Sequence, residues 1–297
     1  MPCGVQAARW FLGCPVWAHA GWRGRLFARR ARRSEFLPQY ASVFGAVEGN
    51  STFYALPPPE TAKRWAKEAP AGFRFCFKFP RRISHELGLR RAEAETRVFL
   101  RWLEPLRERM GPVFLQLGPR FGPESTADLR AFLRGLPADL AVAVEVRNTG
   151  FFDNGVGERM LDDVLGEAGV DRVHFDTQAL FAACEEDAAL AEARRRKPRL
   201  PLRQTVTGRR PFVRFVGEPR IERNGPWLEP WVKAVARWVR EGLEPHVFIH
   251  HADDLYAPDL ARFFHARLVE LDPALGPVPS WPGEDEASQG PEQLALF

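Results

Sequence analysis

The fold of this chain follows from one pattern, which is clearest in the stretch Val43-Phe44-Gly45-Ala46-Val47-Glu48-Gly49-Asn50-Ser51-Thr52-Phe53-Tyr54. An apolar run ends there in a carboxylate, and small and polar residues follow at once. Short apolar runs bounded by glycine and polar residues are typical of strands buried in a sheet. We therefore predict a strand over 43–48 with polar side chains at its carboxyl end.

The same pattern recurs along the chain, and amphipathic stretches separate the runs. Buried strands that alternate with helices are typical of repeated βα units and a parallel sheet. The prediction is an α/β fold, a single (β/α)8 TIM-like barrel, because no strand leads into the GxGxxG turn of a dinucleotide-binding sheet. The predicted strands are 10–14, 43–48, 73–79, 113–117, 141–146, 172–175, 212–216 and 247–250, and the predicted helices are 35–44, 60–68, 93–110, 124–135, 157–168, 182–196, 227–241 and 258–271.

Composition is that of a globular protein, with 45% hydrophobic and 12% aromatic residues among 297. No apolar run approaches the roughly 18–20 residues of a membrane-spanning helix, so we expect a cytoplasmic protein without a membrane partner. The four cysteines lie far apart and predict neither a disulfide framework nor a zinc knot. We predict a barrel domain over 1–272 and a flexible Pro/Glu-rich tail over 273–297.

The residues that follow the predicted strands are strongly polar, and in a (β/α)8 barrel such residues build the active site. A charged side chain at the end of an apolar strand is costly to bury unless it pairs or meets a ligand. The catalytic candidates are Glu48, Lys78, Glu145 and Asp176, and the substrate-binding candidates are Trp17, Asn50, Thr52, Tyr54, His85, Gln116, Arg147, Arg214 and His250.

Two interpretations of these charges remain open. They form a network of buried ion pairs that closes the mouth of the barrel, or they form a pocket for an anionic substrate. In the pocket, Glu48 or Glu145 is the general base. Lys78, Arg147 and Arg214 then stabilise negative charge. We favour the pocket because five separate strands contribute to it.

Several segments resemble the DUF72 (YecE-like) family. The hallmark is Val47-Glu48-Gly49-Asn50-Ser51-Thr52-Phe53-Tyr54-Ala55-Leu56-Pro57. The resemblance covers about residues 10–271 and implies a TIM-like barrel with these residues around its mouth, but it specifies no reaction. The segments that agree with it are Gly13-Cys14-Pro15-Val16-Trp17, Phe75-Cys76-Phe77-Lys78-Phe79-Pro80 with Ser84-His85, Leu115-Gln116-Leu117 and Ala143-Val144-Glu145-Val146-Arg147.

Two positions depart from the pattern that the resemblance implies. Arg214-Phe215-Val216-Gly217 stands where the family usually has Arg-x-His-Gly, so an acid–base histidine is missing at Val216. His250-His251 stands where the family usually has paired Asn. These departures leave open whether the chain is an enzyme or a non-catalytic binding module.

A metal cofactor is an expectation that we do not favour. Carboxylates and imidazoles on several strands are zinc and manganese ligand types. His250 and His251 are adjacent, however, so strand alternation turns only one of them inward. The sequence therefore specifies no cofactor. The residue types in question are Glu48, His85, Glu145, Asp176 and His250 or His251.

Nucleic acid is a second class of partner beside an anionic small molecule. A cluster of arginines follows the first strand on the predicted functional face, which suits a phosphate backbone. A second basic cluster precedes the seventh strand, and we expect it at the opposite end. The first cluster is Arg23, Arg25, Arg29, Arg30, Arg32 and Arg33, with Arg81 and Arg82 on the same face, and the second is Arg194, Arg195, Arg196, Lys197 and Arg199.

The chain ends in Gln293-Leu294-Ala295-Leu296-Phe297, which resembles the QLxLF peptide that docks bacterial replication and repair proteins on the sliding clamp. One hydrogen-bonding Gln and three apolar anchors, Leu294, Leu296 and Phe297, suit a preformed groove. The alternative is an apolar end that folds back on the barrel. Two functions thus stay open beside a binding module: an enzyme for a phosphate or sugar-phosphate, and a DNA-associated barrel recruited through its last residues.

Overall fold

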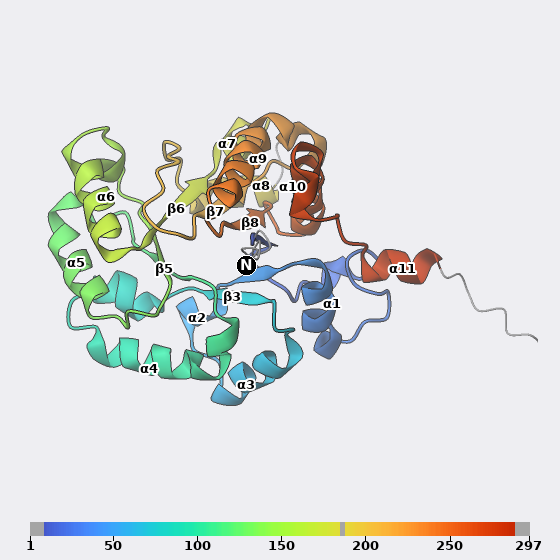
Figure 1. Cartoon of the computed structure of the whole chain (residues 1–297), viewed down its shortest axis with the longest axis horizontal. Helices are drawn as coiled ribbons and strands as arrows, with labels where there is room; N and C mark the ends of the chain where they lie inside the picture. Colours follow the sequence, from blue (N-terminus) through green and yellow to red (C-terminus); the bar gives the residue numbers. More distant parts are fainter. Residues whose placement is uncertain (1–8, 185–187, 289–297) are drawn as a thin grey trace, which may run out of the picture.

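The computed structural model of the chain describes residues 9–184 and 188–288. Short parallel strands lie in the interior and helices surround them (Figure 1). All eight predicted strands coincide with strands of the structure, although most boundaries differ by one to three residues. The strands are β1 (Phe11–Gly13), β2 (Ala46–Gly49), β3 (Arg74–Phe77), β4 (Val113–Gln116), β5 (Val142–Glu145), β6 (Asp171–Asp176), β7 (Phe212–Val216) and β8 (His246–His250).

The helices bury one apolar face each, as the spacing of their apolar residues predicts. The predicted helix 182–196 corresponds to α8, which begins six residues later, and α2, α7 and α11 were not predicted. The helices are α1 (Phe36–Val43), α2 (Ser51–Tyr54), α3 (Pro59–Glu68), α4 (Glu93–Leu103), α5 (Thr126–Arg134), α6 (Val156–Ala168), α7 (Gln178–Ala182), α8 (Ala188–Arg196), α9 (Gly225–Arg240), α10 (Ala257–Leu271) and α11 (Pro282–Ser288). Shorter turns are η1 (Ala20–Trp22), η2 (Arg33–Glu35), η3 (Arg82–Glu86), η4 (Glu104–Arg109), η5 (Pro123–Ser125), η6 (Thr149–Phe152), η7 (Ile221–Asn224) and η8 (Pro273–Leu275).

The strands form two parallel sheets. One has six strands in the order β1-β8-β7-β6-β5-β4, and the other pairs β2 with β3. Backbone hydrogen bonds join the sheets at both edges. Between β3 and β4, Phe79 N donates to Phe114 O at 3.0 Å and Gly111 N donates to Phe75 O at 2.9 Å, and between β1 and β2, Glu48 N donates to Cys14 O at 3.1 Å. The α/β class of the prediction is therefore confirmed, with a curled six-stranded sheet as its main element.

Each strand contributes one residue to a small apolar cluster inside the sheets. Side chains alternate along a strand, so the residue two positions further on faces the same way. That second set is mostly polar, and it lies on top of the apolar one. The apolar set is Phe11, Ala46, Cys76, Phe114, Ala143, Val173, Phe212 and Phe248. The residues two positions further, which we call the polar layer, are Gly13, Glu48, Lys78, Gln116, Glu145, Phe175, Arg214 and His250.

The segment after α10 differs from the predicted flexible tail. Trp281 is only 3% exposed, and its ring lies 4.8 Å from the guanidinium carbon of Arg262 on α10. Glu284 of α11 accepts from Arg262 at 2.5 Å. Composition predicted flexibility here because Pro, Gly and Glu dominate, but one buried tryptophan is enough to fix the segment. Residues 289–297, with the predicted docking peptide, lie outside the described residues.

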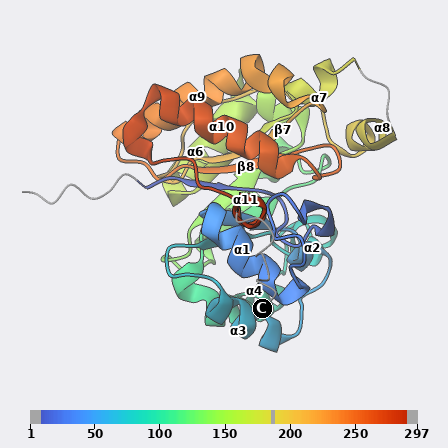
Figure 2. The ribbon, with the colours of Figure 1, turned by 90° about the vertical axis from the view of Figure 1, so that its right-hand side faces the viewer.

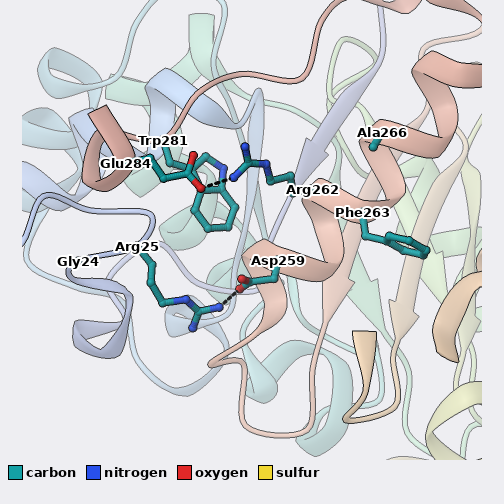
Figure 3. Close-up of a pocket in the computed structure, with 8 residues that line it drawn as sticks. All are labelled: Gly24, Arg25, Asp259, Arg262, Phe263, Ala266, Trp281 and Glu284. Carbon is teal, nitrogen blue, oxygen red and sulfur yellow. Dashed lines mark hydrogen bonds and ion pairs between the residues drawn. The ribbon is translucent and has the colours of Figure 1, made fainter. Parts of the chain in front are cut away.

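Figure 3 shows how this segment is held. An open cavity of about 430 Å³ separates α10 from the loop after β1, and Trp281 and Glu284 form another of its walls. Arg25 of that loop pairs with Asp259 of α10. We call Trp281 together with α11 the clasp, because it contacts both the first α/β unit and the last helix of the sheet region.

Across residues 9–184 and 188–288, no helix has the length and apolar character needed to span a membrane.

Candidate functional site

Arg214 lies at the centre of the polar layer. Its Nε and Nη2 donate to the two oxygens of Glu48, each at 2.7 Å, and its Nη1 donates to Glu145. Both carboxylates are 0% exposed and Arg214 is 6% exposed. One guanidinium therefore bridges carboxylates that come from the two different sheets.

Glu48 has no free acceptor position. Besides Arg214, Asn50 Nδ2 donates to its Oε1 at 2.7 Å and His250 Nε2 lies 3.1 Å from its Oε2. An ionised carboxylate offers about four acceptor sites, so four donors fill it and His250 must carry its proton on Nε2. Burial raises the pKa of Glu48, but Arg214 and His250 outweigh burial and hold the pKa well below its usual range. Glu48 is thus a fixed anion that holds Arg214.

Glu145 is the second fixed anion. Arg147 Nε donates to its Oε1 at 2.8 Å. Burial opposes its ionisation, yet Arg214 first and Arg147 next lower the pKa to about 2. Two carboxylates and two guanidinium groups therefore already balance one another, and a further cation in this place has no unpaired carboxylate to meet.

Lys78 is that further cation. It is 7% exposed, its Nζ donates to Gln116 at 2.8 Å, and the ring centroid of Phe53 lies 3.7 Å away. Within residues 9–184 and 188–288, no carboxylate forms an ion pair with it. Burial, and after it Arg214, lower its pKa to about 7. Near neutral pH the amine is therefore divided between its charged and neutral forms.

The other predicted binding residues lie around this centre in different ways. Thr52 Oγ1 donates to Lys78 O at 2.7 Å and so supports the backbone of the lysine. Tyr54 is 81% exposed and lies at the rim. Trp17 packs edge-on against Trp65, with the ring centroids 4.8 Å apart. It also lines an apolar cavity of about 380 Å³ that Glu48 and Asn50 line as well.

His85 lies beside Lys78, across the ring of Phe53. Its imidazole centroid is 5.2 Å from the Phe53 centroid, and its Nδ1 lies 2.8 Å from Ser84 Oγ. Burial first, and then Lys78 and Arg147, lower its pKa to about 4. The ring is therefore neutral at physiological pH.

Asp176 was predicted in the mouth, and this prediction is wrong. Its Oδ2 accepts from Trp231 Nε1 of α9 at 2.8 Å, and its Oδ1 accepts from Gln178 N at 2.9 Å. Burial raises its pKa. The reason is strand alternation, because Phe175 takes the inward position on β6 and Asp176 turns toward the helices. Asp176 therefore has a structural role.

The second basic cluster was expected at the opposite end of the sheet, and it lies at the same end as the mouth. α8 packs on Phe175 and Val216, and Figure 2 shows α7, α8 and α2 toward one side of the molecule. Lys197, just after α8, is half-buried. Burial lowers its pKa, and Asp254, Arg214 and Glu48 are the next strongest influences. The described part of the connection after β6 therefore lies beside the mouth.

The first basic cluster is partly used to hold its own loop. Arg23 Nε donates to Ala31 O at 2.8 Å, and Arg25 pairs with Asp259. Arg32 pairs with Glu35 at 3.2 Å. These contacts leave fewer arginines for a nucleic-acid track than the sequence predicted.

The carboxylates that the sequence offered as metal ligands form hydrogen bonds and ion pairs with protein groups. Glu48 and Glu145 hold Arg214, and Asp176 faces α9. Among the described residues, no group of three His, Cys, Asp or Glu side chains is close enough to hold a metal ion.

These features define an α/β protein with a buried, arginine-bridged polar site at the carboxyl ends of parallel strands. The family model described as "Protein of unknown function DUF72" matches residues 11–283. The chain belongs to this family. It is 36% identical over 272 residues to the UPF0759 protein YecE of Escherichia coli strain K12, which covers 92% of this chain and 97% of YecE.

Solved structures agree with this assignment of the fold. A DUF72 family protein from Thermotoga maritima matches with a TM-score of 0.66 at 22% identity, over 88% of this chain and 99% of that one. A DUF72 family protein from Enterococcus faecalis matches with a TM-score of 0.65 at 20% identity, over 89% of this chain and 94% of that one. Both carry the same overall arrangement of strands and helices.

Proposed function

We propose that this chain is an enzyme for a small anionic substrate of the phosphate or sugar-phosphate class, and that Lys78 is its proton-transfer group. The observation that carries the proposal is the state of Lys78, a buried amine whose pKa is about 7 and which has no carboxylate partner among the described residues. An amine with a pKa near the working pH is suited to general acid–base catalysis. Burial next to other cations is a known way to create one.

The charges around Lys78 favour an anionic substrate. Glu48 and Glu145 are balanced by Arg214 and Arg147, so Lys78 and Lys197 are cations in excess. A substrate anion would supply the missing negative charge in a place of low dielectric, where such pairing is strong. The neutral Lys78 amine then accepts a proton from the substrate and becomes an ammonium beside that anion.

The carboxylates have a different role from the one the sequence suggested. Glu48 was a candidate for the general base, but its four acceptor positions are filled and its pKa is far below neutral. Glu145 also stays ionised, and two of its acceptor positions are taken. Both act as rigid anions that orient Arg214 and Arg147.

We also propose that the two sheets close into one (β/α)8 barrel. The hydrogen bonds between Phe79 and Phe114 and between Glu48 and Cys14 support this, because they link the sheets at both seams. The bridge from Glu48 across Arg214 to Glu145 adds a side-chain link between the sheets. In a closed barrel Lys78 and Glu145 face a common centre.

The proposal is tested by titrating Lys78 directly. We expect its ¹⁵Nζ resonance to change with a midpoint near pH 7. Sulfate keeps its charge in this range and favours the ammonium, so it should raise that midpoint. By linkage, a rise of one unit should make sulfate bind about fivefold more tightly at pH 6 than at pH 8.

Two variants make this test specific. Lys78→Met should bind sulfate equally at both pH values, whereas Lys233→Met, on exposed α9 surface, should behave as the unmodified chain. In a screen of sugar phosphates, the turnover that identifies the substrate should fall about 10²–10⁴-fold in Lys78→Met. A Lys78 that stays charged above pH 9, or that does not respond to sulfate, would remove the proposal.

A second candidate function is recruitment to a sliding clamp through Gln293, Leu294, Leu296 and Phe297, which lie outside the described residues. The clasp favours it, because α11 is anchored at the periphery and the last described residue, Ser288, lies there (Figure 1). We expect clamp capture by the full chain and its loss when residues 293–297 are deleted. Equal capture by both forms would exclude this route.

A further inference from the structure

We propose that a groove beside the mouth binds a second anionic group of the substrate, so that the substrate is an elongated bis-anion such as a bisphosphate. This inference rests on the proposed function of the mouth. The groove has a volume of about 750 Å³, which lies within the range of small-molecule sites. Its walls are the loop that follows β3 and the loop that follows β4, and both loops leave the carboxyl ends of their strands.

Arginines in excess make this groove suitable for an anion. Arg81, Arg90 and Arg120 line it together with Glu86 and Asp128. Asp128 is taken by Arg90 at 2.8 Å, and Glu86 is taken at 3.2 Å by Arg82, which is not part of the lining. In the part of the chain that the structure describes, Arg81 and Arg120 form no ion pair. They are exposed, and they enter the groove from opposite walls.

The groove continues the mouth. His85 lines the groove, and its ring shares the Phe53 ring with Lys78. After burial, the charges of Lys78 in the mouth and Arg81 in the groove both lower the pKa of the His85 imidazole. A substrate whose first anion lies at Lys78 and Arg147 therefore reaches Arg81 and Arg120 by passing one imidazole.

The two walls of the groove contain backbone conformations and close contacts that few residue types allow. η3 is a π-helical turn, a rare form that is frequently found at functional sites. Leu89 and Arg91 keep positive φ angles of 69° and 52° in the same wall. Gly118 of the opposite wall approaches His85 so closely that a Cβ there would lie 3.2 Å from the imidazole. Positions with such restrictions persist when the surrounding structure requires them.

A small bis-anion fits this groove better than a nucleic-acid strand. Proteins that bind single strands offer exposed aromatic rings on which bases stack. Phe121, the phenylalanine of the lining, is only 8% exposed. The groove therefore offers cations and polar groups, and little surface for a base.

The test compares methylphosphonate with straight-chain alkane bisphosphonates of increasing length, at pH 7, by calorimetry and by the Lys78 ¹⁵Nζ resonance. We expect one chain length to bind at least tenfold more tightly than methylphosphonate. Arg81→Gln and Arg120→Gln should each remove this gain and leave methylphosphonate binding unchanged. Arg101→Gln, which removes an exposed arginine of α4 outside the groove, should retain the gain.

The outcomes separate this inference from the proposed function. If methylphosphonate shifts Lys78 but no bisphosphonate binds more tightly, the groove inference fails and the mouth remains. If neither ligand shifts Lys78, the proposed function fails. Two further outcomes would overturn the assignment of a small bis-anion. One is a gain of affinity that persists in both groove variants. The other is displacement of the best bisphosphonate by a single-stranded oligonucleotide in a way that depends on Arg120.

Discussion

Replacing Arg214 by Met should destabilise the fold by about 3–5 kcal/mol at neutral pH, as expected when one partner of a buried ion pair is removed. The variant keeps Glu48 and Glu145 fully buried and takes away the cation that both carboxylates share. Denaturation by urea, followed by circular dichroism, measures this loss. Arg130→Met is the matched control, because the ion pair of Arg130 with Glu167 is exposed. Its loss should change the free energy of unfolding by less than about 0.5 kcal/mol.

The loss should depend on pH with a definite sign. In the unmodified chain the folded-state pKa values of Glu48 and Glu145 are depressed, so their contribution is present above their unfolded pKa and is lost as pH falls through the folded value. Without Arg214, burial raises both pKa values, and stability then falls as pH rises. The difference between the two proteins should therefore be larger at pH 7.5 than at pH 5. A loss below about 1 kcal/mol at pH 7.5 would contradict the bridging role of Arg214.

Replacing Gly13 by Ala should lower the free energy of unfolding by about 3 kcal/mol, at the upper end of the usual range for overpacking. A Cβ at this position would lie 2.0 Å from the carbonyl oxygen of Ala46, which is backbone and cannot rotate away. Gly13 is the β1 member of the polar layer, and its lack of a side chain is what lets β1 approach β2 at the seam between the sheets. The loss should be visible as a lower urea midpoint at unchanged slope.

Gly166→Ala is the control for this substitution. No atom lies within 4 Å of the Cβ that it would add on α6, and alanine in a helix is favoured over glycine by roughly 0.5–1 kcal/mol. We therefore expect a small stabilisation. If Gly13→Ala were as well tolerated as Gly166→Ala, the close approach of β1 and β2 at Gly13 would not be needed for stability.

Sequence alone predicted the strands well because each is a buried run with a clear end. The run ending at Glu48 and the run from Phe212 to Val216 are examples, and both appear as β2 and β7. The clasp was not predicted, since its segment has the composition of a flexible tail and depends on the packing of Trp281. Composition averages over residues, whereas one tryptophan can fix a segment by itself.

For the candidate site, the sequence predicted which residues meet better than it predicted what each of them does. Glu48, Glu145, Arg147 and Arg214 meet as expected, but how they share hydrogen bonds depends on distances that a sequence does not contain. Asp176 was misplaced because β6 extends one residue beyond the inward position at Phe175. Counting in steps of two from the apolar set would have shown this.

Of the two interpretations of the charges, the ion-pair network is observed, and the pocket for an anionic substrate remains our proposal. The ion-pair network is present and consists of Glu48, Arg214, Glu145 and Arg147. Lys78 lies outside its pairing, and burial first, with Arg214 next, lowers the pKa of the amine. The network and an unpaired amine therefore lie side by side, and Arg214 of the network contributes to the electrostatic environment of that amine.

The pairing of β1 with late segments of the chain affects when the fold can form during synthesis. Trp10 Nε1 donates to Leu275 O at 3.0 Å, a contact between residues 265 positions apart, and β1 pairs with β8. A ribosome releases β1 early and must make nearly the whole chain before these partners emerge. Contacts of such separation form slowly, and an unpaired strand edge meanwhile attracts other chains. A nascent chain halted before β8 therefore has an unprotected first strand.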